Sequence, residues 1–195
     1  MLKFVFRSLS AAAVLGIALA PAAASAAPLT PGALVVSHAT SGSDPSVDTT
    51  VTFSVTIGAL TITAPASVDL GSGVPGGKIQ GGMGDVVVTD DRANLAASWT
   101  ATASATDWAL TPGGGTGPET IPVADVTYDP GTVSTTGNIT ATPHPITLSH
   151  AAQTVVNGTA GVGNNTATWD PALEVSVPAA AVGGAYSGTI TDSVS

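Results

Sequence analysis

Residues 99–106 read Trp-Thr-Ala-Thr-Ala-Ser-Ala-Thr, so apolar and hydroxyl-bearing side chains alternate at every position. This period of two is typical of a β-strand that buries one face and leaves the other in water. Trp99 shares its face with alanines, and small neighbours leave room for a large ring in a core. The pattern predicts a strand with a buried tryptophan, the alternative being a ring exposed for stacking on a glycan.

The same alternation recurs on both sides of this strand. It is found at residues 51–57, 60–63, 173–177 and 186–191, with clusters of glycine and proline between the runs. Many short strands separated by turn residues predict an all-β fold, an antiparallel sandwich or barrel. Of the two we expect a single antiparallel β-sandwich of the immunoglobulin-like kind. Because the last run persists almost to the end of the sequence, we expect the C-terminal strand to belong to a sheet.

The first residues have the three parts of a secretory signal peptide. Lys3 and Arg7 precede an apolar run at 11–20, and Ala24-Ser25-Ala26 fits the pattern of small residues at a cleavage site. The apolar run is short for a membrane span, which needs about 20 residues. We therefore expect residues 1–26 to direct secretion to the extracellular space and to leave no membrane anchor.

The remaining chain divides into an N-terminal lead at 27–48 and a sandwich domain at 49–195. Of the 4 Lys and Arg residues, only Lys78 and Arg92 follow the leader, whereas the chain has 13 Asp and Glu residues and no cysteine. Such an acidic chain is a poor partner for nucleic acids or anionic lipids. The lack of cysteine excludes disulfides, cysteine-bound zinc and a thiol nucleophile.

A family resemblance enters at residues 86–92, Val-Val-Val-Thr-Asp-Asp-Arg, and at Ser98-Trp99-Thr100-Ala101 just after them. Together they resemble the first half of a WxL domain, a cell-surface domain of Gram-positive bacteria. Residues 53–71 resemble its opening part and residues 167–191 its closing part. The resemblance extends over about residues 49–195. The chain is also similar to small secreted proteins of actinobacteria.

The Trp-x-Leu motif of that family occurs literally once, as Trp108-Ala109-Leu110. Ala101 stands where the motif has leucine after Trp99, and Asp192-Ser193-Val194 stands where a C-terminal copy is expected. The resemblance implies a β-sandwich that binds the cell wall non-covalently, with peptidoglycan as its partner. It also marks a set of motif residues, namely Asp90, Asp91, Arg92, Trp99 and Leu110.

Two tryptophans are candidates for contact with such a polymer. Trp108 lies just before a Pro/Gly-rich loop at 111–118, and Trp169 precedes Asp170-Pro171. A core position for Trp108 and an edge position for Trp169 are the alternatives. The second functional hypothesis is a subunit of a surface complex that joins protein partners by strand addition.

The sequence offers little catalytic chemistry. His38, His144 and His150 lack the spacing of a metal site, and no Gly-x-Ser-x-Gly motif is present. We therefore expect a protein that is not an enzyme and that has no cofactor.

The aspartates at the predicted strand ends and turns are Asp85, Asp90, Asp91 and Asp129. They are expected to form a solvated acidic rim, with a calcium site as the alternative. Arg92, a rare cation in this chain, is expected to pair with an aspartate on a neighbouring strand.

Overall fold

The computed structural model describes residues 36–37, 47–113 and 117–195. Contacts divide the chain after Ser54 into two units. In the first unit, the two-residue strands β1 (Val36–Ser37) and β2 (Asp48–Thr49) pair antiparallel. The predicted signal peptide and most of the predicted lead lie outside the described residues.

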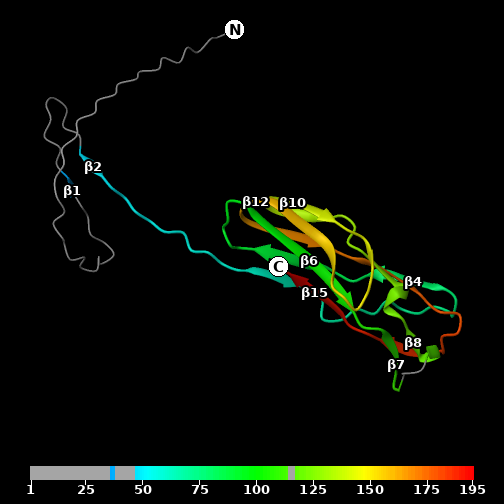
Figure 1. Cartoon of the computed structure of the whole chain (residues 1–195). Helices are drawn as coiled ribbons and strands as arrows, with labels where there is room; N and C mark the ends of the chain where they lie inside the picture. The colour runs from blue at the N-terminus through cyan, green and yellow to red at the C-terminus, as the bar shows by residue number, and fades with distance from the viewer. Residues whose placement is uncertain (1–35, 38–46, 114–116) are drawn as a thin grey trace, which may run out of the picture. The chain divides into compact units, whose positions relative to one another are not determined.

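The regular secondary structure of the second unit is almost entirely β-strand, and all of its strand pairs are antiparallel (Figure 1). This confirms the predicted all-β, sandwich-like fold. None of the helices in the described ranges has the length and apolar character that a membrane span needs. The strands are β3 (Leu60–Thr63), β4 (Lys78–Gly82), β5 (Val86–Asp90), β6 (Ala97–Ala105), β7 (Trp108–Thr111), β8 (Thr120–Ile121), β9 (Val126–Asp129), β10 (Ser134–Pro143), β11 (Ile146–Thr147), β12 (Gln153–Trp169), β13 (Ala172–Ser176), β14 (Ala185–Ser187) and β15 (Ile190–Val194). The short 3₁₀ helices η1 (Gly117–Glu119) and η2 (Val123–Asp125) flank β8.

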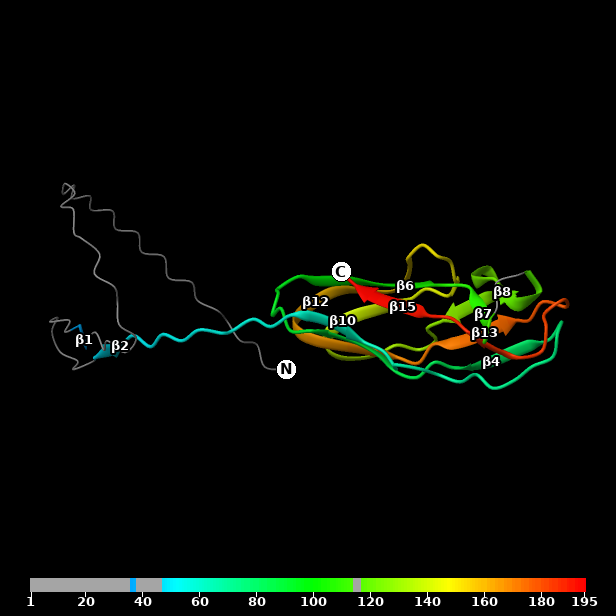
Figure 2. The same cartoon turned by 90° about the horizontal axis from the view of Figure 1, so that it is seen from below.

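Strand β12 organises the largest sheet. It pairs with β10 along one side, and on its other side with β6 near its start and with β5 near its end. Beyond these, β15 lies beside β6 and pairs with it (Figure 2). Strand β3 pairs with β5. The remaining sheets have the strand orders β11-β9-β13-β4 and β14-β7-β8.

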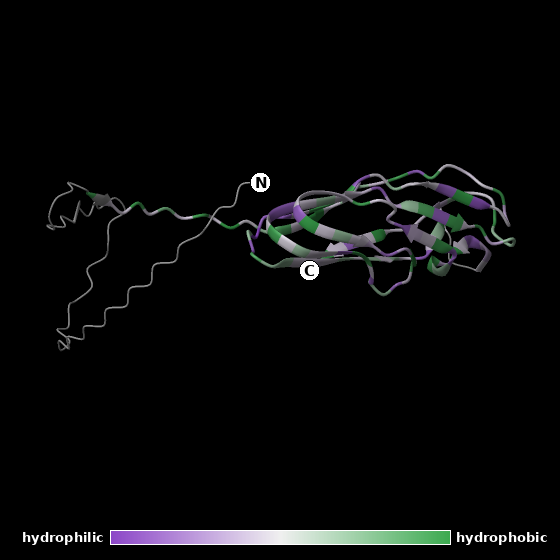
Figure 3. Ribbon diagram, turned by 90° about the horizontal axis from the view of Figure 1, so that it is seen from above, coloured by the Kyte–Doolittle hydropathy of each residue, from purple (hydrophilic) through white to green (hydrophobic). Residues whose placement is uncertain are grey.

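The core lies beneath β5, β6 and β12. Burial on β6 alternates as the sequence predicts, with Ala101 and Ala103 fully buried and Trp99 only 3% exposed. Figure 3 shows hydrophobic and hydrophilic residues alternating along the strands. The Trp99 ring lies against Gly158, its partner residue on β12. The prediction of a core tryptophan is therefore confirmed.

The strand predicted at 51–57 is absent, which corrects the sequence analysis. The structure has no strand between Thr50 and Ala59, and the side chains of residues 51–57 are exposed. Pairing with β5 begins only at Gly58, whose N–H donates to the Asp91 carbonyl at 2.8 Å. A regular period of two needs a neighbouring strand to become a sheet element, and the described residues supply none here.

The predicted run at 186–191 divides between two sheets. Its first part forms β14, which pairs with β7, and its second part begins β15, which pairs with β6. Gly188 stands at the break, where a Cβ atom would lie 2.8 Å from the Trp108 ring. The prediction that the C-terminal strand belongs to a sheet is confirmed.

Candidate functional site

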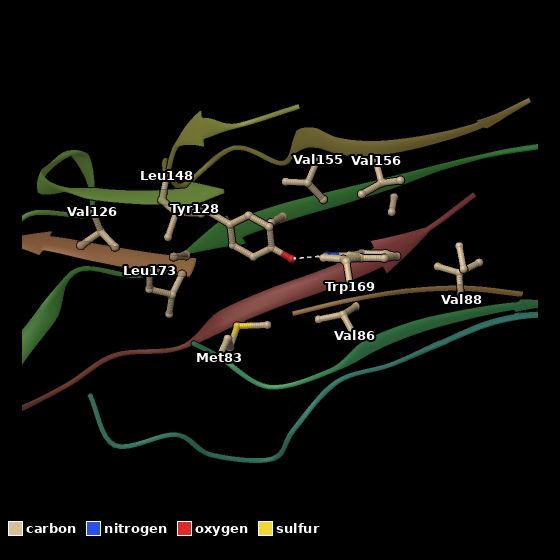
Figure 4. Close-up of a cluster of buried hydrophobic side chains, with 14 of the residues drawn as sticks. Met83, Val86, Val88, Val126, Tyr128, Leu148, Val155, Val156, Trp169 and Leu173 are labelled. Atoms are coloured by element: carbon tan, nitrogen blue, oxygen red, sulfur yellow. Dashed lines mark hydrogen bonds between the residues drawn. The ribbon is translucent and has the colours of Figure 1, made fainter. Parts of the chain in front are cut away.

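A largely apolar cleft of about 700 Å³ lies in the second unit. One wall is residues 64–73, which follow β3, and the other is residues 181–190, which lead into β15. The floor comes from strands of the sheet that contains β9 and β13. Figure 4 shows Met83 between the segment that leads into β15 and the segment that follows β3.

The floor of the cleft is buried and apolar. Val126 on β9 is fully buried, and Leu173 and Val175 on β13 are 3% and 8% exposed. Val68 on one wall and Val182 on the other are each 45% exposed. The walls therefore present apolar side chains to whatever enters, above an apolar floor that is almost fully buried.

Asp192 is a carboxylate in this largely apolar lining, and a chain of hydrogen bonds holds it. The Trp169 Nε1–H donates to the Tyr128 hydroxyl at 3.0 Å (Figure 4). That hydroxyl donates to Asp192 Oδ1 at 3.2 Å. Burial raises the pKa of the Asp192 carboxyl, and the hydrogen bond from Tyr128 opposes this in part. The pKa of Tyr128 is raised as well, chiefly by burial.

Asp192→Asn is expected to stabilise the protein at neutral pH. When the pKa of a carboxyl is raised in the folded state, the free energy of unfolding falls as pH rises from the unfolded pKa, about 3.9, through the folded pKa. Asparagine keeps an oxygen for the Tyr128 hydroxyl and has no charge to bury. Thermal unfolding should show a higher Tm than wild type at pH 7 and a shrinking difference toward pH 3. A lower Tm at pH 7 would contradict this.

Trp108 is half-buried and lines the cleft, as its candidacy for binding requires. The ring lies over Gly188, so one of its sides is already covered. Leu110, the other end of the literal motif, is opposite Tyr186 in the pairing of β7 with β14. The motif thus brings Trp108 and Tyr186 to the same cleft.

The prediction that Trp169 contacts a polymer is wrong. It is 1% exposed, because the last residues of β12 alternate inward with Ala167 and place its ring in the core. Its indole N–H is used by Tyr128. The ring therefore supports Asp192 from within and does not face a polymer.

The pair Asp90 and Arg92 also differs from the prediction. Asp90 is fully buried and not part of a solvated rim, since it follows Val86 and Val88 on the inward face of β5. Arg92 Nε and Nη2 donate to its two carboxylate oxygens at 2.9 Å each. The partner is thus two residues away in the same turn and not on a neighbouring strand. These hydrogen bonds lower the pKa of Asp90.

Arg92 also links two strands. Its Nη2 donates to the Ser98 carbonyl at 2.8 Å, which ties the end of β5 to β6. Asp91 contributes through its backbone, since its N–H donates to the Ala59 carbonyl at 3.0 Å. The predicted motif residues therefore serve the architecture of the sheet.

The other predicted polar residues stay apart. Asp85 and Asp129 are exposed, and Asp129 Oδ1 accepts from the Gly131 N–H at 2.9 Å. Within the described ranges, no three acidic, histidine or cysteine side chains come together as metal ligands would. His144 contacts Asn157 at 3.2 Å and His150 contacts Asp107 at 3.3 Å, whereas His38 lies outside the described residues.

Comparison with known protein families, curated proteins and solved structures returns no match. The resemblance to WxL domains therefore stays a prediction.

Sequence reasoning missed Asp192 and Tyr128. A signal for Asp192 was present, because it stands between Ile190 and Val194 at an inward position of an alternating strand. The cleft itself left no such signal, since its walls are irregular segments without a period.

Proposed function

We propose that this protein is a non-enzymatic interaction protein of the cell surface whose cleft accepts an extended, apolar β-strand from a partner. The observation that carries the proposal is an apolar cleft next to two strands, β3 and β15, that lie beside each other with their outer backbone groups unpaired. Strand addition uses backbone hydrogen bonds for affinity and pockets for alternate side chains for specificity.

The hydrogen bonds of β15 show which of its backbone groups are left without a partner strand. Thr100 and Ser195 exchange both backbone bonds, at 2.9 and 3.1 Å, so every second residue before Ser195 also faces β6. The N–H and C=O groups of the residues between them, including Ile190 and Asp192, point away from β6. No strand of the described residues pairs with that side, although β3 lies beside it.

The edge of β3 has the same property. The bond from the Asp91 N–H to the Ala59 carbonyl makes Leu60 and Asp90 a non-hydrogen-bonded pair. The backbone groups of Leu60 and Ile62 therefore point away from β5. Both strands run in the same direction, because each is separated from β12 by one antiparallel neighbour. A strand added to either edge would therefore run antiparallel to it, and it would take the place that the other edge now holds.

A labelled chain tests the proposal. The sequence has no cysteine, so Val182→Cys gives one attachment point for an environment-sensitive dye at the cleft. The probe is a peptide of alternating valine and threonine with lysines at both ends. We expect saturable binding that changes the dye emission. A peptide of the same composition with consecutive valines should give no change.

The matched control is Val162→Cys, because Val162 is also 45% exposed but does not line the cleft. Dye at this position should not respond to the alternating peptide. An equal response at both positions, or none at either, would refute strand binding in the cleft.

Wall binding is the second candidate function, and the position of Trp108 favours it. A half-buried indole at a cleft can stack on a sugar ring while its body stays packed. Under this proposal the partner is peptidoglycan, as the resemblance implies, and the contact includes Trp108 and Tyr186.

Trp108→Ala is expected to abolish pelleting with purified cell-wall sacculi, because it removes the apolar surface of the contact. The measurement is co-sedimentation of the full chain at two salt concentrations, with near-UV circular dichroism to verify folding. Leu95→Ala is the control, since Leu95 is 85% exposed and outside the cleft. Absence of wild-type pelleting, or undiminished pelleting of a folded Trp108→Ala variant, would remove Trp108-mediated wall binding.

A further inference from the structure

The apolar residues of the segment 51–57 are unusually exposed for a soluble protein. The exposed fractions are 78% for Val51, 89% for Phe53, 76% for Val55 and 74% for Ile57. Soluble monomers seldom present contiguous apolar side chains in this way, and such a segment indicates an interaction site. Its alternation with Thr and Ser is the pattern that a half-buried strand needs.

The segment cannot fold back to form a hairpin with the outer edge of its own β3. Only Gly58 and Ala59 separate Ile57 from β3, so these two residues would have to form the loop of such a hairpin. Both of these residues are already bonded to Asp91 on the opposite side, at 2.8 and 3.0 Å. A Cβ atom on Gly58 would lie 2.6 Å from the Asp91 Cβ, so this point of the chain is closely packed. The segment is therefore available to another molecule.

Charge makes a second copy a suitable partner. Residues 49–58, Thr-Thr-Val-Thr-Phe-Ser-Val-Thr-Ile-Gly, carry no charge in a chain with 13 acidic residues. The charged side chains that line the cleft are the carboxylates Asp69 and Asp192. An uncharged strand can approach these carboxylates without repulsion, whereas acidic surfaces of two copies repel each other.

The side-chain pattern of the segment also suits the cleft. A seven-residue strand is about 23 Å long, at about 3.3 Å per residue. Its apolar side chains would lie on one face, opposite a floor that includes Val126, Leu173 and Val175. Its hydroxyl-bearing residues would face water.

We propose that residues 51–57 of one copy occupy the cleft of a second copy. This inference rests on the proposed function, because it names the strand that the cleft accepts. The donor segment and the cleft are different surfaces, so the contact is head-to-tail and a bound pair still offers one free donor and one free cleft. The chain should therefore form oligomers of increasing length as its concentration rises.

Sedimentation velocity of the full chain over a concentration series tests the inference. Wild type should shift to larger species with concentration, and Phe53→Asp should remain monomeric, because a carboxylate would enter an apolar cleft. Thr52→Asp is the matched control, since it places the same charge one residue away on the opposite face. It should oligomerise like wild type.

The acceptor side is tested with Val182→Asp, which should also remain monomeric, against Val162→Asp, which should oligomerise. Mixing Phe53→Asp with Val182→Asp restores one intact donor and one intact cleft. The mixture should give only 1:1 dimers, because neither partner can extend the chain.

Three outcomes would overturn the inference: a monomeric wild type at every concentration, loss of assembly in Thr52→Asp as well as in Phe53→Asp, or no dimer in the mixture. The dye-labelled Val182→Cys chain distinguishes these failures from failure of the proposed function. If it binds the alternating peptide while wild type stays monomeric, the cleft accepts strands but not from its own kind. If it binds nothing, both proposals fall.

Discussion

Gly158→Ala is expected to destabilise the protein by about 3 kcal/mol or more, at the upper end of the cost of overpacking a core. A Cβ atom at this position would lie 2.6 Å from Nε1 and 2.7 Å from Cδ2 of Trp99, in the middle of the ring. The ring cannot move aside, because it is 3% exposed and its N–H donates to Asn165 Oδ1 at 3.4 Å. Urea unfolding followed by far-UV circular dichroism measures the loss.

The control is Gly183→Ala. No atom outside its chain neighbours lies within 4 Å of a Cβ atom there. This variant should unfold within about 0.5 kcal/mol of wild type, as surface substitutions usually do. If Gly158→Ala were as stable as wild type, Trp99 would not be packed against β12 as described.

Asp90→Ala is expected to cost about 3 kcal/mol, the lower end for breaking a buried ion pair. The lower end applies because the Arg92 side chain is 30% exposed, whereas that of Asp90 is not exposed. Without Asp90, the guanidinium loses two charge-assisted hydrogen bonds and the link between β5 and β6 loosens. Asp91→Ala is the adjacent control and should change the free energy of unfolding by less than about 0.5 kcal/mol.

The pH dependence gives this prediction a second readout. The hydrogen bonds from Arg92 lower the pKa of Asp90, so its contribution is complete above the unfolded pKa, about 3.9, and is lost as pH falls through the lower folded value. The difference in stability between wild type and Asp90→Ala should therefore shrink in acid. A difference that stays constant from pH 7 to pH 2 would contradict an ionic role. The effect has the opposite sign to that of Asp192, whose pKa is raised.

The period of two predicts most of the strands. The position of a residue within an alternating strand also predicts its burial better than the residue type does. Asp90 continues the inward series of Val86 and Val88, and Trp169 continues that of Ala167. Burial of both therefore follows from position in an alternating strand. A classification by residue type places Asp90 in solvent and leaves Trp169 free for binding, which the structure contradicts.

The sequence misleads at residues 51–57 for a physical reason. Alternation reports that one face of a segment suits burial, but it does not say which molecule provides the opposite surface. The cleft could not be predicted either, because residues 64–73 and 181–184 have no period and the floor comes from strands far apart in the chain. Only the three-dimensional pairing brings these parts together.

Amide hydrogen exchange of the full chain, with and without the alternating valine–threonine peptide, tests strand acceptance in the cleft most directly. Phe53→Asp is used for both samples, so that its own segment does not compete. The account predicts slower exchange in residues 190–194 and 60–63, whose outer edges are unpaired, and in the walls at 64–73 and 183–189. Unchanged exchange there, or protection confined to the outer edge of β10 or β4, would contradict it.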